Sequence, residues 1–264
     1  WEYPRASMAR MDPTASFREN ARVQIAALFR PSLAVPVAGV VASELALYLG
    51  HLDVSLWGHL LTLLFCVLGP LALGNDDLLQ AFALVPLFRL VNLGMPVFVK
   101  LTLLWFPLVY APLVPGMYLV ARNNDVDLSF RPKLAVALLP VSVVLGAVLG
   151  HVEYAIIRPD ALVRSLALSD LALITVVMVC FVGFVEEFVY RGVLQRLLEE
   201  RVGRLGGLLV SSALFGLMHS AYHVPGELAF AAGIGLVFGL VYDATDSLAT
   251  VTVIHGALNV FLFA

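Results

Sequence analysis

Nine long apolar runs follow one another along the chain, with short polar stretches between them. They fall at roughly 32–50, 55–74, 79–94, 98–120, 134–152, 169–190, 206–223, 226–243 and 248–264. A helix needs about 20 residues to cross the ~30 Å hydrocarbon core of a bilayer. The run 79–94 is short and carries Arg89 and Asn92, so it is interpreted as a half-span or a re-entrant helix. We therefore predict an all-α fold, a polytopic transmembrane helical bundle of about eight spans (7–9).

The composition agrees with lipid as the main solvent. Hydrophobic residues make up 61% of the 264 positions and charged residues 13%, whereas an average soluble domain carries roughly 25% charged residues. Membrane lipid is thus an expected partner. Nucleic acid is not, because the net charge is −3 and no basic face is apparent. Cys66 and Cys180 lie inside apolar runs and are interpreted as small hydrophobic residues.

The chain divides into three predicted parts. Residues 1–30 comprise a remnant of an N-terminal tag and a cytoplasmic segment, 31–160 hold the N-terminal transmembrane helices, and 161–264 form a C-terminal transmembrane core. Arginines favour the cytoplasmic side of a membrane protein. They precede the first run at positions 10, 18, 22 and 30, and follow the run 169–190 at 191, 196, 201 and 204. The N-terminus and the C-terminal end of the run 169–190 are therefore both predicted to be cytoplasmic, which requires an even number of membrane crossings between these two points.

Charged residues within the apolar runs are the most informative feature. Glu186 and Glu187 lie about fifteen residues into the run that contains Leu171. A charge at the bilayer centre costs about 2.5–3.5 kcal/mol even on the lenient insertion scale. Arg191 follows Glu187 by four residues on the same helix face and can neutralise it. Glu186 points about 100° away from Glu187 and needs another partner.

Two later runs supply candidate partners for Glu186. His219 lies in the run 206–223, and His255 lies in the run 248–264 with Asn259 one turn after it. Carboxylates and imidazoles from three spans could provide a general base and the nitrogen and oxygen donors of a divalent metal site. Four further ionisable residues are isolated in the sequence and are interpreted as interfacial or packing residues: Glu44, His59, Glu153 and Asp243.

Small residues four apart predict where the helices touch. Such pairs let helix backbones approach closely in lipid. They occur in the C-terminal runs as Gly207 with Ser211, Ser212 with Gly216, and Gly235 with Gly239. We expect these runs to form a tight bundle around a polar site.

The segment Val193–Arg204 is amphipathic, with leucines at 194, 197 and 198 among charged residues. This pattern is typical of a helix that lies in the membrane interface. We expect the segment to border the path by which a substrate's membrane-proximal part reaches the site.

Three motifs in order resemble the CAAX-protease and bacteriocin-processing (CPBP) family of intramembrane proteases, also called the ABI family. They read Glu186-Glu187-Phe188-Val189-Tyr190-Arg191, Phe215-Gly216-Leu217-Met218-His219, and His255-Gly256-Ala257-Leu258-Asn259. These match the family pattern Glu-Glu-x-x-x-Arg, Phe-x-x-x-His and His-x-x-x-Asn without substitution. Each motif alone is weak, but the three in order on hydrophobic spans are a strong signal. The resemblance covers roughly residues 165–264.

The resemblance implies an endopeptidase similar to type II CAAX prenyl endopeptidases, acting on a membrane-anchored peptide or protein at a site that opens toward the cytoplasm. Glu186 would activate the attacking water, and Asn259 would hydrogen-bond the developing oxyanion. Arg191 would fix Glu187. His219 and His255 would complete the site, either by binding metal or by orienting the water.

A metal-dependent and a metal-free mechanism both stay open at this point, because the family has been argued to contain glutamate-type and zinc-type proteases. Glu186, His219 and His255 would form a three-ligand set for one catalytic Zn²⁺ with an open fourth position. The second glutamate of the pair would then serve as the base.

Two other functions remain compatible with the residues. Intramembrane Glu and His also build the relays of ion- or proton-coupled transporters, but charged or broken helices would then be expected in both halves of the chain. A non-catalytic membrane scaffold or immunity protein could keep every motif residue. The sequence specifies neither a cleavage preference nor an oligomeric state.

Overall fold

The computed structural model describes residues 17–74, 76–94 and 103–264, so the predicted tag remnant lies outside the described residues. These ranges contain helices and no strand. The first helices are α1 (Phe17–Leu28), α2 (Pro31–Tyr48), α3 (Leu52–Leu68), α4 (Pro70–Leu73) and α5 (Asp77–Gly94). The middle of the chain forms α6 (Trp105–Tyr110), α7 (Leu113–Asn123), α8 (Pro132–Ala137) and α9 (Leu139–Ile157). The remainder forms α10 (Leu168–Val177), η1 (Met178–Gly183), α11 (Phe184–Glu187), η2 (Phe188–Gln195), α12 (Arg196–Val202), α13 (Arg204–Leu217), η3 (Ser220–Tyr222), α14 (Pro225–Thr245) and α15 (Leu248–Phe263).

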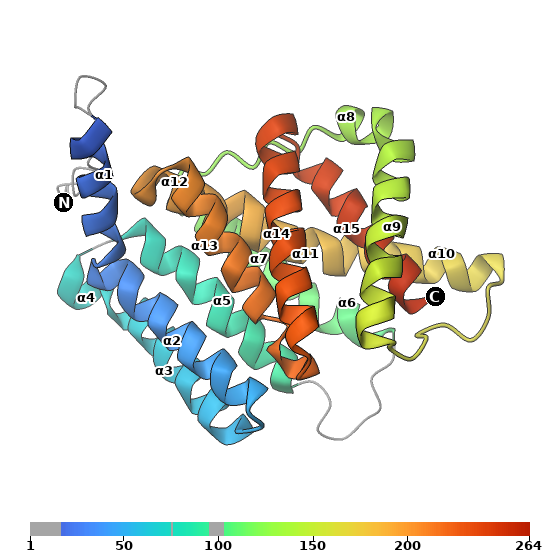
Figure 1. The fold of residues 1–264 in the computed structure, drawn as a ribbon, viewed down its shortest axis with the longest axis horizontal. Helices are drawn as coiled ribbons and strands as arrows, with labels where there is room; N and C mark the ends of the chain where they lie inside the picture. The colour runs from blue at the N-terminus through green and yellow to red at the C-terminus, as the bar shows by residue number, and fades with distance from the viewer. Residues whose placement is uncertain (1–16, 75, 95–102) are drawn as a thin grey trace.

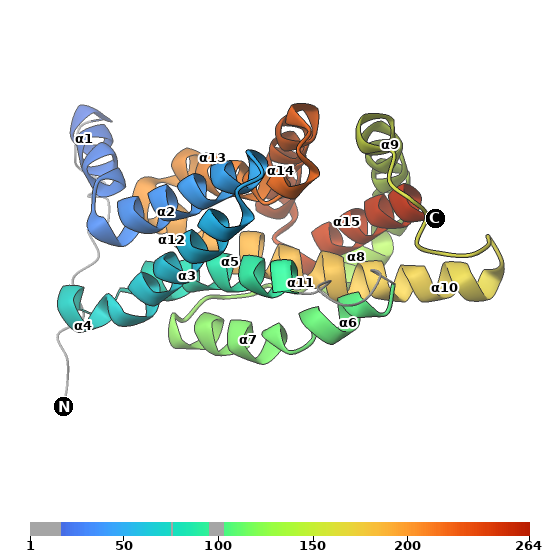
Figure 2. The ribbon, with the colours of Figure 1, turned by 90° about the horizontal axis from the view of Figure 1, so that it is seen from below.

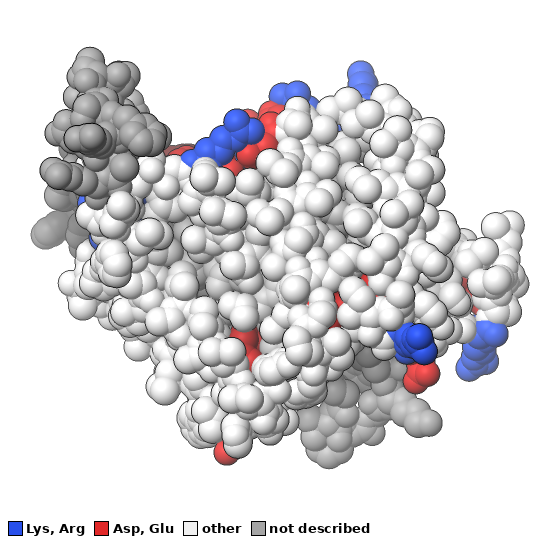
Figure 3. Space-filling view, viewed as in Figure 1, with Lys and Arg blue, Asp and Glu red and all other residues white. Residues whose placement is uncertain are grey.

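Seven helical segments of the described chain are long and apolar enough to cross a membrane. They are Pro31–Tyr48, Leu52–Leu73, Asp77–Gly94, Leu139–Ile157, Leu168–Val202, Arg204–Tyr222 and Pro225–Thr245. The predicted all-α, polytopic bundle of seven to nine spans is thus confirmed. A broad band of one face is nearly free of charged side chains, and lysines and arginines gather at its edges (Figure 3).

Two apolar runs behave differently from the prediction. The run 79–94 is a full-length candidate span, α5, and its charged residue Arg89 is buried inside the protein instead of facing lipid. The run 98–120 is not one helix in its described part, because α6 ends at Tyr110 and α7 begins after Pro112. Proline lacks the N–H that would continue a helix, which explains the break.

The segment Leu168–Val202 is the central helix of the fold. It crosses the molecule between α6 and α7 on one side and α13 and α14 on the other (Figure 2). Two stretches of it, η1 and η2, are π-helical. Such stretches add a residue to the turn and are frequent at functional sites. The Glu186–Glu187 pair lies between them.

The helix α15 is shorter than a typical span and largely buried, and it packs along α9 and η1 (Figure 1). Glycines allow this close approach. A Cβ added at Gly146 would lie 2.6 Å from Ala257 Cβ, and one at Gly150 would lie 2.5 Å from the Leu258 carbonyl oxygen. Only glycine fits there, so the two helices are in backbone contact.

The small residues of α13 and α14 meet as predicted. A Cβ at Gly235 would lie 3.0 Å from Ser212 Cα, and one at Gly216 would lie 2.6 Å from Ala232 Cβ. The two helices pack side by side. The predicted tight C-terminal bundle is therefore present.

The leucine face of the segment Val193–Arg204 is buried in the protein and does not face lipid, as an interfacial helix would require. Leu194, Leu197 and Leu198 are 0%, 6% and 0% exposed, since α12 packs against α13, α1 and η2. A leucine face covered by protein cannot contact lipid or substrate. The amphipathic pattern reflects a half-buried helix of the bundle, and the substrate path along this segment stays a prediction.

Candidate active site

Glu187, Arg191 and His255 form a fully buried network between the central helix and α15. Glu187 is 0% exposed. Its Oε1 lies 2.7 Å from His255 Nδ1 and accepts a 3.2 Å hydrogen bond from Arg191 Nη1, while Arg191 Nε lies 3.2 Å from Oε2. An ionised carboxylate only accepts hydrogen bonds, so the imidazole proton is on Nδ1. The lone pair on His255 Nε2 is consequently free.

Arg191 is held from several sides. Its Nη2 donates to the carbonyl oxygen of Gly235 on α14 at 3.1 Å. The guanidinium lies 4.4 Å from the Phe215 ring centre and 5.5 Å from that of Phe238, within the range of cation–π attraction. Arg191 thus ties the central helix to α13 and α14 and fixes Glu187.

Glu186 is the more accessible carboxylate of the pair, with 14% of its side chain exposed. Its Oε1 accepts a 3.0 Å hydrogen bond from the Tyr110 hydroxyl, and its Oε2 lies 3.8 Å from His255 Nε2. The structure therefore brings Glu186 and His255 together, as the sequence predicted. The two side chains face each other at a distance slightly beyond a direct hydrogen bond.

His219 lies where α13 ends and η3 begins. Its Nδ1 is 3.1 Å from the Phe215 carbonyl oxygen, and both His219 and His255 pack against the Phe215 ring. Both imidazoles line a cavity of about 20 Å³ together with Asn259 and Glu153. This volume suffices for one water molecule. The predicted residues on α13 and α15 thus share one small polar space.

A larger cavity of about 330 Å³ lies elsewhere, where α12 meets the end of α14. Its lining residues are Asp125, Val126, Asp127, Arg196, Glu200 and Asp246. None of the predicted site residues belongs to it.

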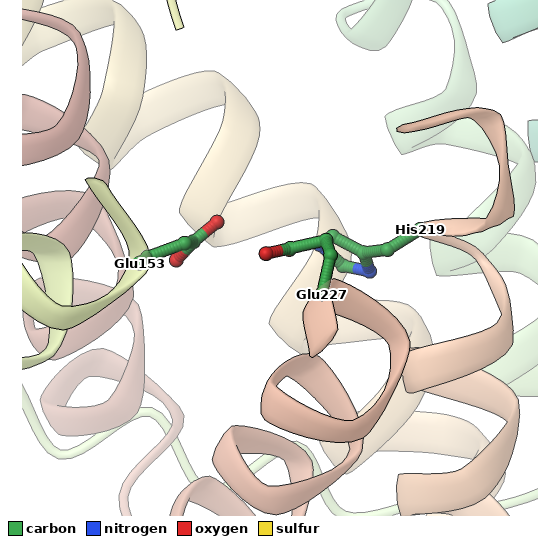
Figure 4. Close-up of side chains that lie close together, drawn as sticks. All are labelled: Glu153, His219 and Glu227. Atoms are coloured by element: carbon green, nitrogen blue, oxygen red, sulfur yellow. The ribbon is translucent and has the colours of Figure 1, made fainter. Parts of the chain in front are cut away.

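The group of three metal-binding side chains that converges in the described chain is not the predicted one. One ligand atom each of Glu153, His219 and Glu227 lies within 4.8 Å of the others (Figure 4). This triad shares only His219 with the predicted set of Glu186, His219 and His255. The difference arises because Glu153 on α9 and Glu227 on α14 approach His219, while His255 is bound to Glu187.

A second buried ion pair holds the segment around His219. Arg89 on α5 donates from Nε and Nη2 to the two oxygens of Glu44 on α2, at 2.7 and 2.8 Å. Arg89 Nη2 also donates to the carbonyl oxygen of Met218, and the Ser220 hydroxyl donates to Glu44. The residues on both sides of His219 are therefore fixed by N-terminal helices across the predicted boundary at residue 160, which itself stays a prediction.

Glu44, His59 and Glu153, interpreted from the sequence as isolated, all have polar neighbours. His59 Nε2 lies 3.2 Å from Glu44 Oε1, and Glu153 belongs to the triad. The same correction applies to Asp243, which pairs with Arg204 at 2.8 Å.

Sequence reasoning missed Tyr110 and Glu227 altogether, and one signal for Glu153 was available. Gly146 and Gly150 are four apart and mark the face of α9 that packs against another helix. Glu153 follows Gly150 by three residues on that face, so its side chain points into the bundle. No comparable spacing singled out Tyr110 or Glu227.

Fold and site together define a class: a multi-pass helical membrane protein with carboxylates and imidazoles clustered inside the bundle. Residues 168–261 match the sequence model of the type II CAAX prenyl endopeptidase Rce1-like family. The matched segment contains all three motifs, so the resemblance noted from them is confirmed over this part of the chain. The match supports a CAAX-type intramembrane protease in general. Comparisons of the chain with curated proteins and with solved structures gave no significant match.

Proposed function

We propose that this protein is an intramembrane endopeptidase that hydrolyses peptide bonds of membrane-anchored substrates with a water activated by Glu186. One observation carries the proposal. Glu186 faces His255 at 3.8 Å, while His255 is oriented by Glu187 and Glu187 by Arg191. A base aligned with an imidazole whose own orientation is fixed by a third group is the arrangement that proton-transfer catalysis requires.

The geometry of Glu186 and His255 suits a shared water. A water oxygen about 2.8 Å from both Glu186 Oε2 and His255 Nε2 completes a triangle with ordinary hydrogen-bond lengths. Tyr110 occupies Glu186 Oε1, which leaves Oε2 to receive the proton. His255 Nε2 accepts the second hydrogen bond from the water. With both of its protons held in this way, the water directs an oxygen lone pair toward the substrate.

The reaction balances with these groups alone. The water oxygen attacks the carbonyl carbon, its proton passes to Glu186, and the carbonyl π electrons move to the oxygen. Asn259, which lines the same small cavity as His255, is the proposed donor to this oxyanion. When the C–N bond breaks, Glu186 returns the proton to the leaving amine and both products depart.

Metal assistance by Zn²⁺, predicted from the sequence, fits the triad Glu153, His219 and Glu227 better than the original set. Both oxygens of Glu227 lack a hydrogen-bond partner among the described residues, so they are available to coordinate a cation. When bound, Zn²⁺ would supply Lewis-acid polarisation of the substrate carbonyl.

The proposed partners are membrane lipid and a membrane-anchored peptide or protein. We propose that the site opens toward the cytoplasm, since arginines 196, 201 and 204 follow the catalytic pair along the chain. Glu186 retains partial exposure while Glu187 has none, which favours Glu186 as the carboxylate reached by water.

A transporter is the second candidate, because Glu44, His59 and Arg89 place buried charge in the N-terminal half as well. Arg89 contacts both oxygens of Glu44, however. A carboxylate held by two hydrogen bonds from a permanently charged arginine is a poor proton carrier. The pair is better explained as a structural support for His219.

The test is cleavage of a membrane-anchored peptide by purified protein in lipid vesicles. We expect Glu186→Gln to slow cleavage about 10²–10⁴-fold, the usual contribution of a general base, while the free energy of unfolding changes by no more than about 1–2 kcal/mol. Glu200→Gln is the matched control, since Glu200 lies exposed on the same long helix and should leave cleavage unchanged. Full cleavage by Glu186→Gln would exclude the proposed mechanism and leave the transporter and scaffold functions.

A further inference from the structure

Glu153, His219 and Glu227 form a cluster separate from the Glu186–His255 pair to which the proposed mechanism assigns the attacking water. They come from three different elements: the end of α9, the turn after α13 and the first turn of α14. One ligand atom of each lies within 4.8 Å of the others. In Figure 4 the carboxylates of Glu153 and Glu227 point toward each other, and the His219 ring lies beside Glu227.

The charge of this cluster is not balanced by the protein. Glu227 is 0% exposed and Glu153 is 5% exposed. Neither oxygen of Glu227 has a hydrogen-bond partner in the part of the chain that the structure describes. Two buried carboxylates this close repel each other strongly unless a cation or a shared proton lies between them. The N-terminus of α14 offers only a partial positive charge.

His219 has the orientation expected of a metal ligand. Its Nδ1 is engaged with the Phe215 carbonyl oxygen at 3.1 Å, so Nδ1 carries the proton and Nε2 has a free lone pair. Metal-bound histidines nearly always donate their second ring nitrogen to a carbonyl or carboxylate in this way. A proton shared between Glu153 and Glu227 would relieve their repulsion but would not use His219.

We propose that Glu153, His219 and Glu227 bind one divalent transition-metal ion. Two carboxylates bring a charge of −2, so a divalent ion makes the buried site neutral, which a membrane interior favours. One imidazole and two carboxylates suit Zn²⁺ or Mn²⁺. These ions hold their ligands at about 2.0–2.2 Å, and rotation of the two flexible glutamate side chains closes the remaining distance.

The ion would lie next to the proposed active site. Glu153 and His219 line the same 20 Å³ cavity as His255 and Asn259, so an open coordination position could be filled by a water in this cavity. That role rests on the proposed function, whereas binding of the ion does not. Metal content can therefore be tested in protein with or without proteolytic activity.

The experiment measures metal binding directly. Full-length protein in detergent is stripped with a chelator, reloaded with Zn²⁺ or Mn²⁺, desalted and analysed for metal per chain, together with its thermal unfolding temperature. We expect about one ion per chain, nitrogen and oxygen ligands near 2.0–2.2 Å by X-ray absorption, and a higher unfolding temperature when the ion is bound.

Glu227→Gln and Glu153→Gln should each weaken binding at least 10-fold and lose the metal-dependent rise in unfolding temperature. Metal-free Glu227→Gln should be at least as stable as the metal-free parent, because it removes an unpaired buried charge, so failure to fold is not an expected explanation. Glu200→Gln is the control with unchanged binding. Absence of bound metal, or binding that both variants retain, would overturn the proposal, and neither result bears on the cleavage assay of Glu186→Gln.

Discussion

Removing either partner of the Glu44–Arg89 ion pair should destabilise the protein strongly and misplace His219. Glu44 is 0% exposed and Arg89 is 4% exposed, and two hydrogen bonds of 2.7 and 2.8 Å join them. Glu44→Gln leaves a buried arginine without a counter-charge, and Arg89→Met leaves a buried carboxylate. Breaking a buried pair in this way costs about 3–5 kcal/mol.

This magnitude is measurable by thermal unfolding in detergent. A change of 1 kcal/mol shifts the midpoint by roughly 2–4 °C in a protein of this size, so each single variant should unfold about 6–20 °C earlier. The double variant Glu44→Gln with Arg89→Met contains no unpaired charge. We expect it to be more stable than either single variant, which a double-mutant cycle reports as a coupling free energy.

The same cycle has a functional readout. Arg89 and Glu44 hold Met218 and Ser220 on either side of His219, so the double variant should stay folded while cleavage slows on the order of 10²-fold, the cost of a misplacement of about 1 Å. Single variants that each lose less than about 1 kcal/mol, as surface pairs do, would refute the reasoning. So would a double variant whose loss equals the sum of the two.

Two further predictions concern packing and pH. Gly146→Ala should lower the free energy of unfolding by about 1–3 kcal/mol, because the added Cβ would press on α15. Gly233→Ala is the control, since a Cβ there meets open space and should be neutral or stabilising. Equal effects of the two variants in thermal unfolding would contradict the proposed contact. Burial raises the pKa of Asp76, but hydrogen bonds and charge from Arg201 outweigh it and lower that pKa below its usual 3.8. Because its pKa is lower in the folded state, ionised Asp76 stabilises the fold above pH ~3.8, and this stabilisation is lost as the pH falls through the folded pKa. Asp76→Asn should therefore lower the unfolding temperature by a constant amount between pH 5 and 8. A penalty that shrinks within that window would show that the ion pair is not its cause.

The fold class could be predicted from the sequence because bilayer thickness sets the length of an apolar run directly. The length of an apolar run did not predict the helix correctly where the run contains a proline or a buried charge. The run 98–120 is interrupted at Pro112, and the run 79–94 was interpreted as a half-span or re-entrant helix because it is short and carries Asn92 and the charged Arg89. Its partner Glu44 lies 45 residues away, and hydropathy does not reveal such a pairing.

The candidate site could be predicted in part for a related reason. Glu187 and Arg191 lie one helical turn apart, so their contact follows from helix geometry. Glu186 and His255 lie on separate helices, and His255 was one of two candidate partners that polar residues within the apolar runs supplied. Glu153 and Glu227 meet His219 only through the packing of α9 and α14 around α13 and α15, and which faces of separate helices meet is fixed by the whole bundle.

The central claim is that Glu186 and His255 act on the same water. The most direct measurement is a double-mutant cycle on the single-turnover rate of peptide cleavage, with Glu186→Gln, His255→Gln and the pair. Residues that act as one unit have non-additive effects, so the double variant should be no slower than the slower single variant. Rate losses that multiply in the double variant would show that the two side chains act independently and would contradict the claim.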